Sequence, residues 1–133
     1  MYFLVSIKMI PEKLKNPDFI CGLDAALRII SGKWKPLILF FLYKETKRYG
    51  ELQRCVRGVT HKMLTQQLKE LVSDGIVTRK DYREIPPRVE YSLTPLGISL
   101  AETLKALCDW GTKNEEAIEA ALARREHRSE KRF

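Results

Sequence analysis

The segment THKMLTQQLKELVSD, residues 60–74, contains side chains that could read the edges of nucleic-acid bases. If the segment is helical, Leu64, Leu68 and Leu71 share one face, and at about 100° per residue the opposite face is polar. That polar face consists of Lys62, Gln66, Lys69 and Ser73. Glutamine can make two hydrogen bonds to adenine in the major groove, and lysine can bond guanine. The pattern therefore predicts base contacts, although the same side chains on an isolated helix would simply be solvated.

The start of this helix offers a site for a phosphate group. Thr60 is a suitable N-cap, and its hydroxyl together with the free N–H groups of the first turn suits an anion. Thr65 lies on the flank of the helix, where it could contact a phosphate or a thymine methyl group. His61 lies nearer the leucine face, so capping or phosphate contact and simple packing both stay open.

The neighbouring elements predict how this helix is held. RYGELQRCV predicts a short helix, Gly58 permits the following turn, and Gly75 ends the helix after residue 74. Together, residues 49–74 have the outline of a helix-turn-helix. Upstream, residues 24–30 predict a short helix capped by Asp24. KWKPLILFFLYKE predicts the central buried helix, because it is apolar almost all round, including Trp34, Leu37, Phe40 and Phe41.

Two strands follow the helix-turn-helix. IVTRKDY and VEYSLT show the β-branched content and alternation of strands, and the loop REIPPR, residues 83–88, joins them. Pro86 and Pro87 cannot donate to a β-ladder and belong in the loop. Arg83 and Arg88, at the shoulders of this wing, could enter a minor groove or could pair with neighbouring acids. The expected fold is a winged helix-turn-helix, mainly α with a small β-hairpin wing (α+β).

The C-terminal part predicts a second copy of the chain as a partner. Thr94 and Pro95 start a helix that we expect to run from residue 95 to 123. Its apolar stripe is longer than a small domain can cover, so we expect it to pack against itself in a homodimer. The interface residues would be Leu100, Leu104, Leu107, Gly111 and Ile118. The expected organisation is an arm over 1–17, a DNA-binding domain over 18–94, this helix, and a disordered basic tail over 124–133.

Charge favours a polyanionic partner. The 133-residue chain has a net charge of +7, and 44% of its residues are hydrophobic, which fits one globular domain. Residues 33–57 contain seven basic and two acidic side chains, so most of the excess lies there. Basic residues here would contact phosphates and contribute salt dependence rather than sequence preference. We expect double-stranded DNA as the partner, with Lys33 and Arg48 among the phosphate contacts.

Other chemistry has little support in the sequence. Cys21, Cys55 and Cys108 are far apart, lack the close spacing of zinc ligands, and fit a reducing cytoplasm. No phosphate loop, nucleophile elbow or metal-ligand motif is present, so we expect no cofactor, no metal and no enzymatic activity. No segment is typical of a signal peptide or a membrane span.

Four motifs, in order, carry a resemblance to a known family: SGKWKPLILFFL, RYGELQR, MLTQQLKELVSDGIVTRKDY and PPRVEYSLTPLG. Residues 21–111 resemble the HxlR-type winged helix-turn-helix transcriptional regulators. The resemblance implies a small dimeric DNA-binding regulator that pairs through its N-terminal and C-terminal helices. It also implies a sensing cysteine at Cys21 in some members; an inert buried thiol is the alternative. The chain departs from the family in having Gly22 where proline is frequent and Thr60 where serine is usual.

The sequence is consistent with three classes of function to different degrees. The first is a homodimeric regulator that places helix 60–74 in a major groove, with an effector that the sequence does not identify. The second is a winged helix that docks onto another protein without binding DNA, because a fold alone does not fix function. An enzyme is the third, and it lacks any supporting motif.

Overall fold

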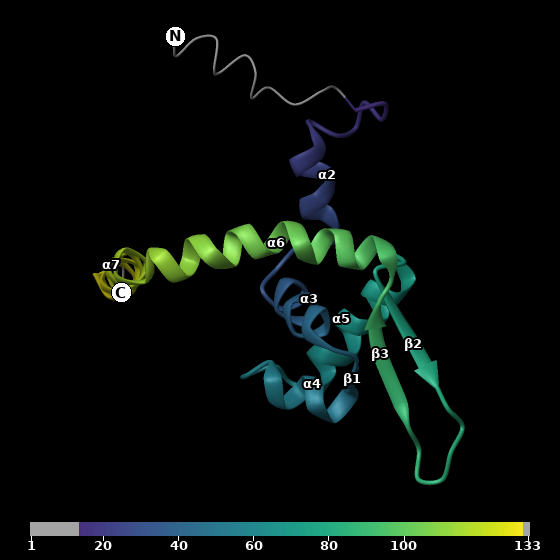
Figure 1. Ribbon diagram of the computed structural model, residues 1–133. Coiled ribbons are helices and arrows are strands. Elements are labelled where there is room, and N and C mark those ends of the chain that lie inside the picture. Colours follow the sequence, from purple (N-terminus) through teal and green to yellow (C-terminus); the bar gives the residue numbers. More distant parts are fainter. Residues whose placement is uncertain (1–13, 132–133) are drawn as a thin grey trace.

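The computed structural model describes residues 14–131, which form a mainly helical domain with a three-stranded antiparallel sheet (Figure 1). The expected fold class is therefore confirmed. Most of the arm expected over residues 1–17 lies outside the described residues. The elements are α2 (Gly22–Ile29), α3 (Trp34–Lys44), β1 (Lys47–Arg48), α4 (Tyr49–Cys55), α5 (His61–Ser73), β2 (Val77–Asp81), β3 (Val89–Leu93), α6 (Pro95–Lys113) and α7 (Glu115–Lys131).

The core is built around α3, as the sequence predicted. Ile38, Leu39 and Leu42 are buried on α3, and they share one cluster with apolar residues of α4, α5, α6 and the sheet. The leucine face of α5 is buried in the same cluster. Leu37 and Phe40, which were also expected in the core, each remain 37% exposed, because they line a groove between α3 and α6.

The helix-turn-helix is formed by α4 and α5. Gly58 has a φ of 87°, a left-handed conformation that glycine adopts without steric cost, and it makes the turn possible. The Thr60 hydroxyl accepts a hydrogen bond of 3.1 Å from the Met63 N–H, which confirms the predicted N-cap. Gly75, with a φ of 74°, follows the end of α5 and confirms the predicted stop.

The sheet has the order β1–β3–β2, and the two predicted strands form its hairpin. In their antiparallel register Arg79 is opposite Tyr91, so these two side chains lie on the same face of the sheet. Strand β1 was not predicted, because two residues are too few to show any alternation. The hairpin extends away from the helices as a wing (Figure 1).

The prediction of a single C-terminal helix over residues 95–123 is wrong, because this segment forms two helices that meet at Asn114. The Asn114 side chain donates to the Trp110 carbonyl at 2.8 Å, and its backbone N–H donates to the same oxygen at 3.1 Å. A side chain that competes for helical carbonyls in this way favours a break. Beyond it α7 runs in a different direction from α6 (Figure 1) and continues to Lys131, through much of the tail expected to be disordered.

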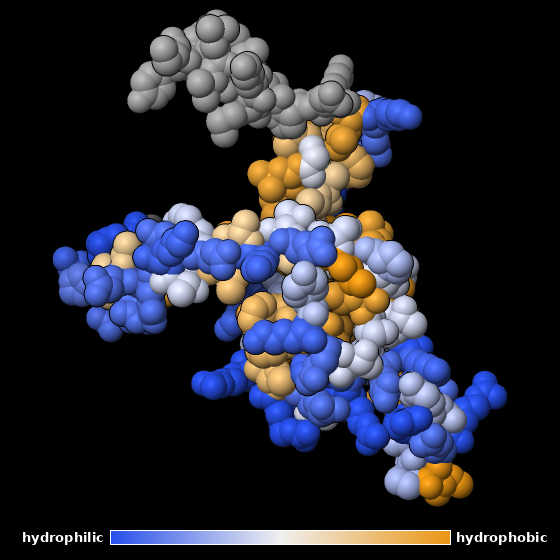
Figure 2. Space-filling model, viewed as in Figure 1, coloured by the Kyte–Doolittle hydropathy of each residue, from blue (hydrophilic) through white to orange (hydrophobic). Residues whose placement is uncertain are grey.

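The first described helix, α2, projects away from the core on the far side of α6 (Figure 1), and only its last residue, Ile29, packs against the core. It starts at Gly22 rather than residue 24, and none of its residues is buried. The Asp24 carboxylate accepts a hydrogen bond from the Ile20 N–H at 2.9 Å, so it helps to hold the start of the helix from within the first turn. Figure 2 shows a largely hydrophobic surface on this segment, whereas the surface of α7 is mainly hydrophilic.

Within residues 14–131, none of the helices combines the length and the apolar character needed to cross a membrane.

Candidate nucleic-acid interface

The outward face of α5 has the composition that the sequence predicted. Its leucines are buried, and the side chains opposite them are exposed. The exposed side chains are Lys62, Gln66, Lys69 and Ser73. The first turn of α5 contains no acidic residue, and two of these four exposed side chains are lysines, so hydrogen-bond donors dominate this face. Base contacts by these side chains stay a prediction.

A hydroxyl group that the sequence analysis missed organises the first turn of α5. The Tyr49 hydroxyl, from α4, lies 2.7 Å from His61 Nδ1, 3.1 Å from the His61 carbonyl oxygen and 3.2 Å from the Thr65 hydroxyl. One arrangement satisfies all three contacts: Tyr49 donates to the carbonyl, while His61 and Thr65 donate to Tyr49. The rings of Tyr49 and His61 also pack edge to face, with centroids 5.2 Å apart. His61 therefore joins the two helices of the motif, and its ring stays exposed at the surface.

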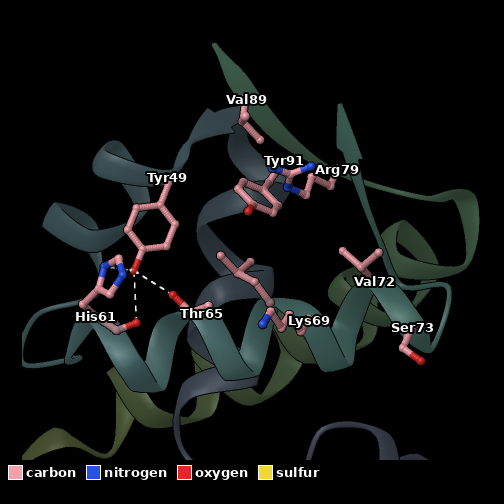
Figure 3. A pocket seen from close by; sticks show the side chains of 10 residues that line it. Tyr49, His61, Thr65, Lys69, Val72, Ser73, Arg79, Val89 and Tyr91 are labelled. Atoms are coloured by element: carbon pink, nitrogen blue, oxygen red, sulfur yellow. Dashed lines mark hydrogen bonds between the residues drawn. The ribbon is translucent and has the colours of Figure 1, made fainter. Parts of the chain in front are cut away.

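A cleft separates α5 from the wing (Figure 3). We call it the wing cleft; its volume is about 610 Å³. The lining residues are Tyr49, His61, Thr65, Leu68, Lys69, Val72, Ser73, Arg79, Val89 and Tyr91. Apolar side chains thus lie beside two cations, Lys69 and Arg79, and beside hydroxyl groups. A sugar–phosphate strand offers the matching chemistry, since deoxyribose is largely apolar and each phosphate is an anion.

Arg79 is the second residue that sequence reasoning missed. It is exposed on β2 and faces the wing cleft because it is paired with Tyr91 in the sheet (Figure 3). The signal was present in the sequence, since the alternation of VEYSL fixes which face Tyr91 occupies. Only the strand register, however, shows that Arg79 shares that face.

The two arginines of the wing have different surroundings. The Arg88 guanidinium stacks 3.6 Å from the centre of the Tyr82 ring and lies 3.2 Å from a Glu84 carboxylate oxygen. A second carboxylate, that of Glu90, is 3.9 Å away. Arg83 is exposed, has a φ of 53°, and makes no ion pair with any of residues 14–131. Arg88 is thus paired with neighbouring acids, which was the alternative to minor-groove contact. Arg83, at the other shoulder of the wing, remains available for such a contact.

Not all of the basic residues over 33–57 face solvent. Lys35 and Lys47 are only 6% and 7% exposed, so these two cannot belong to the phosphate-binding surface that the charge count suggested. Each is paired with a carboxylate at 2.8 Å, Lys35 with Glu70 and Lys47 with Glu45. The hydrogen bond to Glu45 raises the pKa of Lys47, and the same contact lowers the pKa of Glu45.

The remaining basic residues of this stretch are exposed: Lys33, Lys44, Arg48, Arg54 and Arg57. Lys33 lies 4.7 Å from the centre of the Trp34 ring, which holds its ammonium group near the surface of the core. Arg48 immediately precedes α4, and its backbone N–H donates to the Glu51 carboxylate at 3.1 Å. These five cations lie on or next to α3 and α4. Each of them is exposed, so several could contact a phosphate.

Comparison with known proteins identifies the group to which this geometry belongs. The model of the HxlR-like helix-turn-helix family matches residues 29–119. The chain belongs to this family. The uncharacterized HTH-type transcriptional regulator YkvN of Bacillus subtilis (strain 168) is 50% identical over 93 residues, covering 70% of this chain and 79% of YkvN.

Two solved structures extend the comparison to the fold. A transcriptional regulator described as MarR family, from Porphyromonas gingivalis W83, superposes with a TM-score of 0.70 at 39% identity, covering 77% of this chain and 99% of that one. The reduced form of the redox regulator HypR gives a TM-score of 0.70 at 39% identity, with coverages of 74% and 97%. The protein is thus a transcriptional regulator of the winged helix-turn-helix type, and its relatives are regulators rather than enzymes.

Proposed function

We propose that this regulator binds double-stranded DNA sequence-specifically as a homodimer, with α5 in the major groove and the wing loop, residues 83–88, at the minor groove. One observation carries the proposal. The exposed donor face of α5, its capped first turn and the wing cleft form one continuous surface that contains Lys69 and Arg79. Binding to a duplex requires such a surface, because one helix must reach the base edges while neighbouring groups contact the phosphates.

The roles within this surface follow from chemistry. Lys62 and Gln66 would contact base edges, since they lie on the face opposite the core and their side chains match guanine and adenine. The phosphate contacts would come from residues around them: Thr60, His61, Thr65, Lys69, Arg79, Lys33 and Arg48. Arg83 would enter the minor groove, while Arg88 would mainly hold the wing in shape through Tyr82 and Glu84.

The homodimer is supported by apolar surface that the single chain leaves uncovered. The groove between α3 and α6, about 550 Å³, is lined mostly by apolar side chains such as Leu37, Phe40 and Leu107. On α2, Leu23 and Leu27 are 67% and 51% exposed. A second copy that placed its α2 against this groove would bury both surfaces, and clustered exposed apolar residues are typical of an interface. Leu100 and Leu104 already pack against the core, so the partner would cover only what remains of them.

We also propose that Cys21 senses oxidants. Cys21 is partly exposed at the N-cap position of α2, where its modification would act on the helix that we assign to the dimer interface. A redox regulator, HypR, is among the similar structures. The test is DNA affinity before and after treatment with a thiol oxidant. The oxidant should change the affinity of the wild type and leave that of Cys21→Ser unchanged; an equal change in both would contradict this role.

The main proposal is tested by mobility shifts on duplexes selected from a random pool, at several salt concentrations. Lys62→Ala and Gln66→Ala should relax the sequence preference. Arg48→Ala should weaken binding to all duplexes alike and reduce the salt slope by about one. If wild-type protein binds no duplex and instead binds a protein in a salt-insensitive manner, the docking-module alternative is correct.

A further inference from the structure

Gln66, the amide that we assign to base contact, is itself held by a chain of polar contacts that reaches into the core. Its Nε2 donates to Glu70 Oε1 at 3.2 Å, one turn along α5. The other oxygen of the same carboxylate, Oε2, lies 2.8 Å from Lys35 Nζ. The Lys35 side chain is 7% exposed and comes from α3. A buried core residue is thus connected through one carboxylate to the surface of the recognition helix.

The Lys35 ammonium has one carboxylate to neutralise it. Among the residues described, Glu70 is its only ion-pair partner, and an unpaired buried cation would be costly. The hydrogen bond from Lys35, and next that from Gln66, hold the pKa of Glu70 below its ordinary value. Glu70 therefore stays a carboxylate at neutral pH, and it is fixed in place because Lys35 cannot leave the core.

A carboxylate in this position decides the orientation of the Gln66 amide. An ionised carboxylate has only acceptor oxygens, so it can bond the amide nitrogen but not the amide oxygen. The amide must therefore turn its NH₂ group toward the C-terminal end of α5. One N–H of that group and the oxygen Oε1 stay free, in one fixed order along the helix.

We infer that Glu70, anchored by Lys35, is a positioning residue that sets the donor–acceptor order of Gln66 and thereby its base preference. Glutamine reads adenine by donating to N7 and accepting from the N6 amino group, so the two bonds require one direction of the amide. With the order fixed, adenine on one strand is favoured over adenine on the other. The inference rests on the proposed function and adds to it a specificity-determining pair that makes no contact with DNA.

The substitution Glu70→Gln tests this directly, because it is isosteric and changes the order instead of removing the contact. A glutamine at position 70 must present its oxygen to Lys35, which can only donate. Its NH₂ group then faces Gln66, and the Gln66 amide must turn round to present Oε1 to it. The Glu70 side chain is 42% exposed, and a glutamine there still accepts a hydrogen bond from Lys35, but it no longer neutralises the ammonium group. The variant is therefore expected to fold with a lower melting temperature.

The experiment is selection from random duplexes with the full chain, comparing the wild type with Glu70→Gln, Lys35→Met, Gln66→Ala and Gln67→Ala. Glu70→Gln should change one base pair in each half-site, the same one whose preference Gln66→Ala removes. There the preference for adenine should fall about tenfold or move to the other strand. Lys35→Met should weaken the preference at that position. Gln67→Ala, which removes a neighbouring amide that contacts Met63, is the matched control and should leave it unchanged.

The outcomes separate the inference from the proposed function. If the wild type selects a sequence and Glu70→Gln selects the same one, even with a lower melting temperature, Glu70 is only structural and the inference is wrong. The inference also fails if Gln66→Ala leaves every base preference unchanged. If the wild type selects no sequence at all, the proposed function fails as well.

Discussion

The hydroxyl of Tyr49 shows how much a single residue contributes to the placement of α5. It joins α4 to His61, the first residue of α5, and to Thr65, one turn further along, through contacts of 2.7–3.2 Å. Tyr49, His61 and Thr65 all line the wing cleft. The hydroxyl therefore attaches the first turn of α5, where we propose a phosphate contact, to α4.

Tyr49→Phe keeps the ring packing and removes the hydroxyl. We expect a loss of about 1 kcal/mol in the free energy of unfolding, the usual net contribution of such hydrogen bonds. DNA affinity should also fall, because the first turn of α5 loses its attachment to α4. Urea unfolding and a mobility shift measure the two effects.

The control for the loss of stability in Tyr49→Phe is Tyr43→Phe. Tyr43 is 43% exposed, and its hydroxyl forms no hydrogen bond within the described part of the chain. Equal effects of the two substitutions would show that the network around Tyr49 has no special role.

The pair of Lys35 and Glu70 predicts a pH dependence of stability. The lowered pKa of Glu70 means that its stabilising effect is present above the unfolded pKa and is lost as pH falls through the folded one. Lys35→Met removes the cause of that shift. The free energy of unfolding should therefore fall less between pH 6 and pH 3 in Lys35→Met than in the wild type. Both pH values are experimental settings that bracket about pH 4.3, the ordinary glutamate pKa.

Lys33→Met is the matched control, because this lysine is exposed and forms no salt bridge with any described residue. It should show the wild-type pH dependence. A dependence that is the same in all three proteins would show that the pair is not coupled to folding.

At the scale of elements, α6 packs closely against the residue that precedes β2, and Gly97 makes this close contact possible. A Cβ atom on Gly97 would collide with the carbonyl oxygen of Ile76, which immediately precedes β2. The Thr94 hydroxyl donates to the Gly75 carbonyl at 2.6 Å beside it, so the end of α5, the wing and α6 meet within a few residues. This junction sets the position of α5, the proposed recognition helix, relative to α6, which lines the groove that we assign to the dimer partner.

Gly97→Ala should destabilise the fold by about 1–3 kcal/mol, since overpacking forces backbone to move. Thermal unfolding of Gly97→Ala and of Gly50→Ala, a helical glycine with space for a methyl group, makes the comparison. Gly50→Ala should be neutral or stabilising by up to about 1 kcal/mol, because alanine favours helix. A stable Gly97→Ala variant would mean that α6 can shift away from β2 at little cost.

The elements differ in how much of them could be predicted. The leucine period of α5, the cap at Thr60 and the alternation of β3 are local signals, and the structure agrees with each. The break at Asn114 depends on one side chain competing for a carbonyl, which the apolar stripe across it conceals. Likewise, a lysine such as Lys35 is read as exposed until a partner from a distant helix is known.

At the scale of the whole molecule, the single chain leaves apolar surface uncovered on α2 and between α3 and α6. Helix α2 lies on the opposite side of α6 from the wing (Figure 1), and the groove between α3 and α6 shares no lining residue with the wing cleft. Pairing through α2 and this groove would therefore leave the exposed face of α5 free to contact DNA. We therefore expect a dimer of twice the chain mass of 15.5 kDa in sedimentation experiments. Leu23→Arg should produce a monomer, because it places a charge in the apolar contact.

Val72→Arg is the control for the dimer prediction. Val72 is 36% exposed on α5, within the wing cleft and outside the groove, so this variant should stay dimeric. A wild type that sediments as a monomer would remove the basis for a paired DNA site.

The most direct test of the account is a hydroxyl-radical and base-methylation footprint of the wild-type protein on a selected duplex. Two recognition helices held by one dimer should protect two major-groove segments with centres about one helical turn, or roughly 34 Å, apart. Gln66→Ala should lose the base protection while keeping protection of the sugar–phosphate backbone. Protection of a single segment, or of the backbone alone in the wild type, would contradict the account.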